Sequence, residues 1–154
     1  MSTGQLQSES LGVVETDVFA PIRPDFADFD TPVRDSFRWN NILDTLQIPL
    51  GQEVALYAFR SEERADVDHH ILAALDEKAL LAAEESEGFI YYRPNKGLSY
   101  CLWESTVTAE AATSLPAHRE AAQYAVQAYE KWSLNCWMIG RSGTSSEVSF
   151  AQLR

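Results

Sequence analysis

The sequence predicts an α+β fold in which four strands and two helices follow one another in the order β-α-β-β-α-β. Three observations support this prediction. Short runs of aromatic and aliphatic residues alternate with longer segments of helical periodicity. Gly, Pro and Asn residues separate these runs where turns are expected. The chain has 154 residues, a length typical of one domain.

The predicted strands are rich in aromatic and apolar residues, which suit a pleated surface. They cover residues 53–60, 89–93, 98–104 and 134–139. Between the second and the third lies the segment Pro94-Asn95-Lys96-Gly97, whose residue types favour a tight turn. The second and third strands are therefore expected to form a hairpin.

The two predicted helices follow the first and the third strand. The first covers residues 65–87, where Ile71, Leu75, Ala79 and Ala82 lie near one face and Gly88 suits the position after the last turn. The second starts near residue 108, is interrupted at Leu115-Pro116 and restarts at Pro116, a residue favoured in the first helical turn. Helical spacing then continues through Ala117, Ala121, Tyr124, Ala128 and Trp132.

This order is the split β-α-β pattern of ferredoxin-like folds. It implies a four-stranded antiparallel sheet with both helices on one face. The other face would be bare, and a bare apolar face is expected to bury itself in a partner. A second copy of the chain, giving a homodimer, is the simplest such partner.

The chain divides into three predicted regions: 1–52, 53–140 and 141–154. The first holds a polar tail, a Pro-rich arm over residues 16–35 that should lie extended on another surface, and a short helix over 36–46 capped by Ser36. The second is the ferredoxin-like domain. The third is rich in Gly and Ser and is expected to be loose.

The charge and the hydropathy pattern exclude several classes of protein. The formal net charge is −11, and basic residues are scattered singly, so nucleic-acid binding is not expected. No apolar run approaches the roughly 18 residues that span a membrane. The N-terminus lacks the basic and apolar regions of a secretory signal. The expected location is cytoplasmic.

The sequence predicts no metal site and no cofactor site. Cys101 and Cys136 form no Cys-x-x-Cys pair and are expected to be small buried residues. His69 and His70 are adjacent, so on a helix they point about 100° apart and do not readily share one metal ion. A Gly-rich phosphate loop opening a helix is also missing.

Strand alternation sorts the predicted strand residues into two sets. One set is mainly aliphatic and is expected under the helices. The other mixes aromatic bulk with hydrogen-bonding groups, which is typical both of a small-molecule pocket and of a dimer interface. Its members are Tyr57, Phe59, Ser99, Cys101, Trp103, Asn135 and Trp137.

Three stretches in the second half resemble the dimeric α+β barrel superfamily, which includes the antibiotic-biosynthesis monooxygenases and the haem-degrading monooxygenases. They are Trp103-Glu104-Ser105, Ala109 to Ala112, and Leu115-Pro116-Ala117-His118. The resemblance covers about residues 53–140 and implies a dimeric α+β barrel. The segments FRWNNIL at 37–43 and YAFRS at 57–61 also resemble a family of small proteins with no assigned function.

The sequence departs from this superfamily at positions that carry chemistry. The cofactor-independent, quinone-forming members usually have Asn four residues before the Trp, where this chain has Ser99. The haem-degrading members use an Asn in the first strand, and none is present here. Haem degradation is therefore not carried over, and no cofactor is expected.

Two hypotheses for function follow. In the first, the chain is a cofactor-free monooxygenase, isomerase or cyclase acting on an aromatic or polyketide-like molecule. Trp103 would line the pocket, as the resemblance implies, and His118 or Tyr91 would move a proton. In the second, the chain is a non-catalytic dimer or ligand-binding protein. Trp103 is then a core or interface residue, and His118 only begins a helix.

Overall fold

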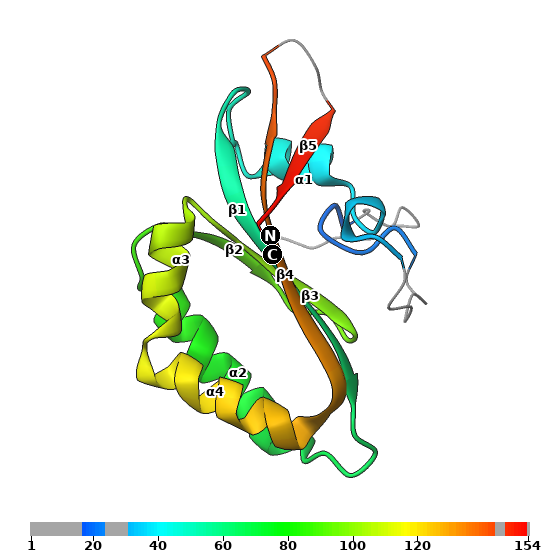
Figure 1. Ribbon diagram of the computed structural model, residues 1–154, viewed down its shortest axis with the longest axis vertical. Coiled ribbons are helices and arrows are strands. Elements are labelled where there is room, and N and C mark those ends of the chain that lie inside the picture. The colour runs from blue at the N-terminus through cyan, green and yellow to red at the C-terminus, as the bar shows by residue number, and fades with distance from the viewer. Residues whose placement is uncertain (1–16, 24–30, 144–146, 154) are drawn as a thin grey trace, which may run out of the picture.

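The computed structural model describes residues 17–23, 31–143 and 147–153. It is an α+β fold with a five-stranded antiparallel sheet in the order β2-β3-β1-β4-β5. The strands are β1 (Glu53–Glu63), β2 (Phe89–Arg93), β3 (Leu98–Trp103), β4 (Tyr129–Arg141) and β5 (Val148–Gln152). The sheet is open and does not close into a barrel within the chain (Figure 1).

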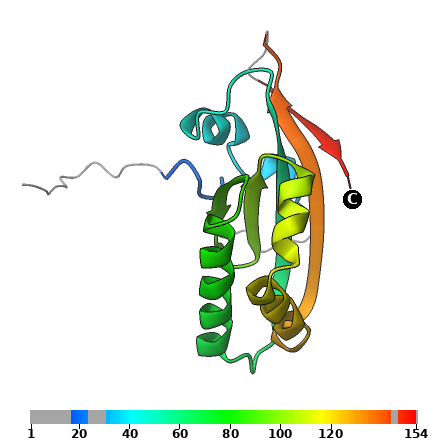
Figure 2. The same ribbon diagram turned by 90° about the vertical axis from the view of Figure 1, so that its left-hand side faces the viewer.

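Three helices lie on one side of the sheet. They are α2 (His69–Glu84), α3 (Thr106–Thr113) and α4 (Pro116–Ala128). Figure 2 shows α2 and α4 side by side, and an ion pair joins them between Lys78 Nζ and Glu120 Oε1 at 2.8 Å. Asp68 caps α2 by accepting hydrogen bonds from two backbone N–H groups, and Ser105 caps α3 through the N–H of Thr108. The Leu115-Pro116 break predicted from the sequence separates α3 from α4.

The other side of the sheet is covered by the N-terminal region, so the prediction of a bare face is wrong. The 3₁₀ turn η1 (Val33–Asp35) and helix α1 (Trp39–Thr45) pack there, and the main hydrophobic core lies between them and the sheet. Ile42 and Leu43 are fully buried in this core. The sheet contributes its aliphatic side chains: Val54, Leu56, Ala58, Leu98, Leu102 and Ile139.

The aliphatic and aromatic sets of strand residues therefore lie on the opposite faces of the sheet from those predicted. The aliphatic set of β1 and β3 lies under α1, and the aromatic set of these strands faces α2, α3 and α4. The face of the sheet that α1 covers continues past this helix along β1 and β4. The strand register places polar residues on that part of the face: Glu62, Lys131, Ser133 and Asn135. This face is therefore covered by α1 over part of its length and carries polar side chains over the rest.

The Pro-rich arm lies along the sheet where it is described. Phe19 packs against Tyr91 in a tilted arrangement with ring centroids 4.3 Å apart, and the N–H of Ile22 donates to the carbonyl of Ser36 at 2.9 Å. The buried Arg60 side chain donates to the backbone carbonyl of Thr31. The rest of the predicted arm, residues 16 and 24–30, and the predicted tail, 1–15, lie outside the described residues.

Several element boundaries differ from the prediction; for example, α2 was predicted over residues 65–87 and covers His69–Glu84. Ser36 ends η1 and does not cap α1, which begins at Trp39 after Arg38. Helix α4 ends at Ala128, before the predicted helical spacing ends at Trp132, because Tyr129 and Trp132 belong to β4. There they pair with Glu63 and Ser61 of β1, which runs three residues past its predicted end. Hydrogen bonding to that extended neighbour outweighs the helical spacing of the local sequence.

The predicted loose C-terminus is wrong over residues 148–152, which form β5 against the end of β4. Phe150 explains why this segment packs against the rest of the fold. Its ring lies 6.1 Å from Trp39 and 6.2 Å from Trp137, so β5 extends the core beneath α1. Residues 144–146 and 154 of the predicted tail lie outside the described part of the chain.

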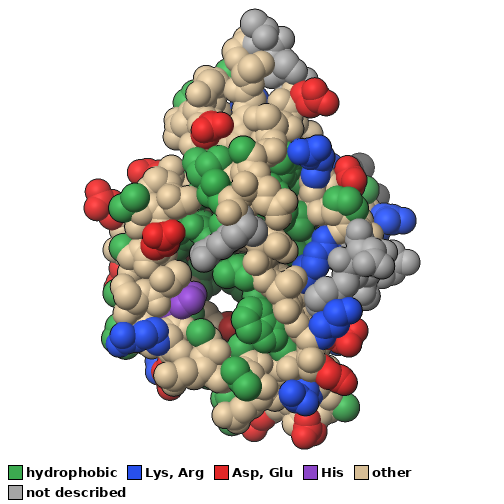
Figure 3. Space-filling model, viewed as in Figure 1, with side chains coloured by type: hydrophobic (Ala, Val, Ile, Leu, Met, Phe, Trp, Pro, Cys, Tyr) green, Lys and Arg blue, Asp and Glu red, His purple; other side chains and the backbone are tan. Residues whose placement is uncertain are grey.

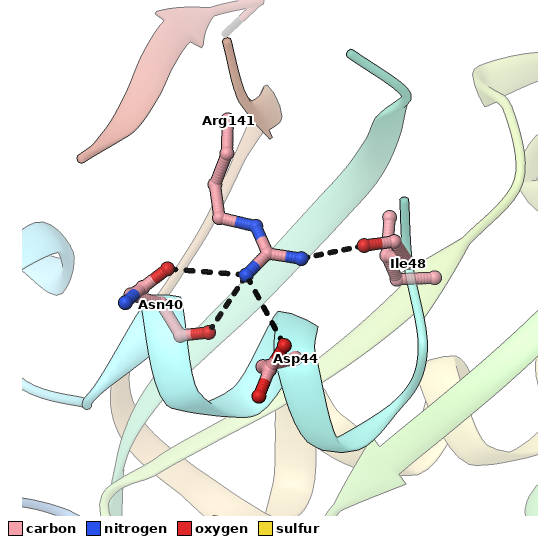
Figure 4. A network of polar contacts seen from close by, with 4 residues as sticks. All are labelled: Asn40, Asp44, Ile48 and Arg141. Carbon is pink, nitrogen blue, oxygen red and sulfur yellow. Dashed lines mark hydrogen bonds and ion pairs between the residues drawn. The ribbon is translucent and has the colours of Figure 1, made fainter. Parts of the chain in front are cut away.

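Helix α1 is held to β4 by one buried arginine (Figure 4). Arg141 is 8% exposed, and its guanidinium donates to the Ile48 carbonyl at 2.5 Å and to Asn40 Oδ1 at 3.2 Å. Asp44 lies 3.7 Å away but is 83% exposed. A buried cation needs such acceptors, because an unpaired one would be strongly destabilising.

We predict that Arg141→Met lowers the free energy of unfolding by about 3 kcal/mol, because it leaves the carbonyl groups around α1 without a donor. Urea denaturation followed by circular dichroism measures this change. The matched control, Asp44→Asn, removes only a solvent-exposed ion pair and is expected to cost less than about 0.5 kcal/mol. Equal losses in both variants would contradict the role given to the backbone carbonyls.

Candidate functional site

A cavity of about 930 Å³ lies between the sheet and the layer of α2, α3 and α4. In the space-filling view an opening remains between the helices and the strands (Figure 3). None of the residues of α2 is buried, although one side of this helix faces the sheet. The helices therefore form an arch over the sheet and do not fill the space beneath them.

Small side chains explain why this space stays open. Six of the eleven residues of α2 and α4 that line the cavity are alanines, namely Ala79, Ala82, Ala83, Ala121, Ala122 and Ala125. A core helix would carry Leu or Ile at such positions, since interiors are normally packed without voids. Alanine keeps the helical geometry favourable while leaving room above the sheet. This alanine pattern is visible in the sequence, and it is the signal that reasoning from strand alternation missed.

The floor of the cavity is aromatic. Tyr57, Phe59, Phe89, Tyr92 and Trp103 line it from β1, β2 and β3. Trp103 is 5% exposed, meets Phe89 edge-on with centroids 5.3 Å apart, and donates from Nε1 to Cys101 Sγ at 3.3 Å. Such a surface suits a flat apolar molecule, because aromatic rings bury large areas in defined geometries.

Six of the residues predicted for the site line this cavity, and three do not. Those that do are Tyr57, Phe59, Ser99, Cys101, Trp103 and His118. Asn135 and Trp137 were wrongly grouped with them. In the observed register Cys136 lies opposite Tyr57, and Trp137 lies opposite Leu56. The alternation in β4 is thus shifted by one residue, which sends both side chains to the α1 side of the sheet.

Tyr91 was the other misplaced residue, and a β-bulge is the reason. The pairing of β2 with β3 shifts between Phe89 and Tyr91, so Tyr91 lies opposite Leu102 while Tyr92 lies opposite Cys101. Tyr91 consequently packs on Phe19 at the α1 side, and Tyr92 lines the cavity. A bulge inserts one residue and reverses the alternation that follows it. Nothing in the local sequence marks this position.

One end of the cavity is polar. Glu63 of β1 lies opposite Tyr129 of β4, and both line the cavity together with Asp76 of α2 and Tyr92. Burial and the nearby Glu63 carboxylate raise the pKa of Asp76. Burial and the charge of Asp76 raise the pKa of Tyr92 to about 12, while a hydrogen bond from Ser99 opposes that rise. Sequence reasoning missed Glu63, Asp76, Tyr92 and Tyr129, because only the folded chain brings them together.

His118 occupies a different part of the cavity wall. It lies in the first turn of α4, next to Leu115, which packs with Trp103, Ala109 and Ala112. Burial lowers the pKa of His118, although a hydrogen bond with the backbone of Thr113 acts in the opposite direction. The imidazole is therefore neutral at pH 7 and able to accept a proton.

Cys101 is not an activated nucleophile. Burial raises the pKa of its thiol to about 11, more than the hydrogen bond from Trp103 lowers it, so the thiol is protonated at neutral pH. Within the described residues, no three His, Cys, Asp or Glu side chains are grouped so as to hold a metal ion. No helix there is long and apolar enough to cross a membrane. The side chains that line the cavity can form hydrogen bonds, stack with a bound ring and transfer protons.

Comparison with known proteins gives a family but no activity. No curated protein matches the chain. The solved structure of Rv0793 from Mycobacterium tuberculosis is similar at a TM-score of 0.47 and 13% sequence identity, covering 55% of this chain and 92% of that chain. The sequence model of the PB2B2.08-like family matches residues 4–152, nearly the whole length. The chain therefore belongs to the PB2B2.08-like family.

Proposed function

We propose that the protein binds an apolar molecule with an aromatic or polyketide-like body in the cavity and acts on it by proton transfer. The observation that carries this proposal is the cavity itself. It holds about 930 Å³, its floor is aromatic, and polar groups reach it from both layers. A protein whose aromatic face served only as packing would fill this space, whereas an enzyme needs room for substrate beside its polar groups.

The residues divide into those that hold the molecule and one that acts on it. Trp103, Phe89 and Tyr57 offer ring faces and edges against which a flat body can stack. His118, neutral at pH 7, would accept a proton from an acidic C–H or O–H group of the bound molecule. Nearer the polar end, the Tyr92 and Ser99 hydroxyl groups would donate hydrogen bonds to polar atoms of the bound molecule.

Such proton removal begins several reactions. An isomerase returns the proton elsewhere on the substrate, and a cyclase uses the carbanion to form a ring. A cofactor-independent monooxygenase, which the resemblance to the antibiotic-biosynthesis monooxygenases implies, lets the anion react with dioxygen. The substrate then supplies the electrons, one oxygen atom enters the product and the other leaves as water. Ser99 stands where those enzymes usually have Asn, so the isomerase and cyclase reactions remain equally open.

A non-catalytic ligand-binding protein is the second candidate. The feature that favours it is the hydrogen bond between the His118 side chain and the backbone of Thr113. A catalytic histidine is commonly oriented by a carboxylate. Conversion of a substrate, as opposed to binding alone, separates the two candidates.

The resemblance to the dimeric α+β barrel proteins also implies a homodimer. Because α1 covers the sheet face that such a dimer would use, pairing would have to involve other surfaces, such as the two sheet edges at β2 and β5. Native mass spectrometry of the full chain would measure the assembly directly.

We predict that Ala122→Phe weakens binding of the neutral aromatic probe N-phenyl-1-naphthylamine by about tenfold or more, because the ring occupies the space that the probe needs. Probe fluorescence during titration gives the affinity. Val126→Phe is the matched control, since Val126 lies on the same helix, is 67% exposed and does not line the cavity. Equal weakening by both variants, or no probe binding to the wild-type chain, would contradict the proposed site.

For catalysis, we predict that the protein converts at least one member of a panel of anthrones, quinols and enolisable polyketide analogues. The variant His118→Gln should lower kcat about a hundredfold and leave KM nearly unchanged. The rate should stay high below pH 6.5 and fall only at lower pH, because burial holds the pKa of His118 below its ordinary value. Oxygen uptake alongside product analysis distinguishes oxygenation from isomerisation. Binding without conversion across the panel would favour the non-catalytic candidate.

A further inference from the structure

Aromatic rings and carboxylates meet at the polar end of the cavity, and the carboxylates are not explained by binding of a purely apolar molecule. The rings form a group of three. Phe59 stacks on Trp132 with centroids 5.8 Å apart and meets Tyr129 edge-on at 5.3 Å. All three line the cavity, and Trp132 is 50% exposed. We call this group, together with Glu63 and Asp76, the aromatic–carboxylate end.

The carboxylates lie beside these rings. Glu63 is opposite Tyr129 in the pairing of β1 with β4, and the charges of Asp76 and Glu63 both act on the Tyr129 hydroxyl. Glu63 also acts on Asp76, so the two acids are close to one another. Two like charges and three ring faces thus border the same part of the cavity.

No strong cation balances them in the described part of the chain. Asp76 has no Lys or Arg within the 4.0 Å of an ion pair there, and the partner of Glu63 is His69, at 3.6 Å. Among the described lining residues the carboxylates are Glu63, Asp76 and Glu110, against one lysine, Lys96. Two neighbouring carboxylates repel one another, and partial burial adds a desolvation cost to each charged form.

A cation placed between them would relieve both effects. Ring faces attract a cation through their quadrupole, and the attraction is stronger where water is excluded. A neutral or anionic group would leave the carboxylates unbalanced. Because the described residues show no cluster of three or more metal-binding side chains, an organic cation fits this end better than a metal ion.

We propose that the molecule bound in the cavity carries a protonated amine, and that the ammonium lies between Glu63, Asp76 and the rings of Phe59, Tyr129 and Trp132. This inference rests on the proposed function, because it names the class of molecule that the same cavity takes. The aromatic body of the ligand would extend over Tyr57 and Tyr92 toward Trp103 and His118.

Isothermal titration calorimetry of the full chain at pH 7.5 tests the proposal with three probes of equal shape: 1-naphthylmethylamine, 1-naphthylmethanol and 1-naphthoic acid. The amine should bind about tenfold more tightly than the alcohol, and the acid most weakly. Asp76→Asn and Glu63→Gln should each reduce the preference for the amine to about threefold or less. Glu62→Gln is the control, because it removes the same charge from the neighbouring residue on the opposite face of β1.

The possible failures are distinct. If the alcohol or the acid binds as tightly as the amine to the wild-type chain, the cavity binds small molecules but the inferred amine is wrong. If the amine preference survives in both Asp76→Asn and Glu63→Gln, or is lost equally in Glu62→Gln, the assignment to these two carboxylates is wrong. If none of the probes binds, the proposed function fails together with this inference.

Discussion

The fold depends on the packing of α1 against the sheet. Ile42 and Leu43 are fully buried beside Val54, Leu56 and Leu102, and Arg141 fixes the helix to β4 through the carbonyl of Ile48 and the side chain of Asn40. This places the main hydrophobic core on the side of the sheet away from the three longer helices. The larger of the two clusters of buried hydrophobic residues therefore forms without them.

This division allows the helical layer to be hollow. Because α1 supplies the main core, α2 and α4 can carry alanine where they face the sheet, and α2 can lack any buried residue. The helices hold to each other and to the ends of the strands, for example where Ala109, Ala112 and Leu115 pack on Trp103. A cavity costs stability when it interrupts a core. Here it lies outside the main core.

The cavity has a different chemistry at each end. Trp103 and His118 form an apolar region with one neutral imidazole, whose pKa burial lowers. Glu63 and Asp76 form an acidic region beside stacked rings, where burial and charge repulsion raise the pKa of Asp76. A molecule that spans both ends would be anchored by charge at one and exposed to a base at the other. Such anchoring away from the reacting atoms is how binding orients a substrate.

By itself, the sequence determined the order of the helices and of the first four strands, but not β5, together with the Leu115-Pro116 break and the grouping of Tyr57, Phe59, Ser99, Cys101 and Trp103 on one face. These features follow from local periodicity, turn chemistry and strand alternation, which act over a few residues. The tertiary structure alone decided that this face lies under the helices, since α1 competes for the other face. It also decided the β4 register that moved Asn135 and Trp137, the bulge that exchanged Tyr91 for Tyr92, and the meeting of Glu63 with Asp76. Each of these depends on pairing between residues far apart in the chain, which leaves no pattern in the local sequence.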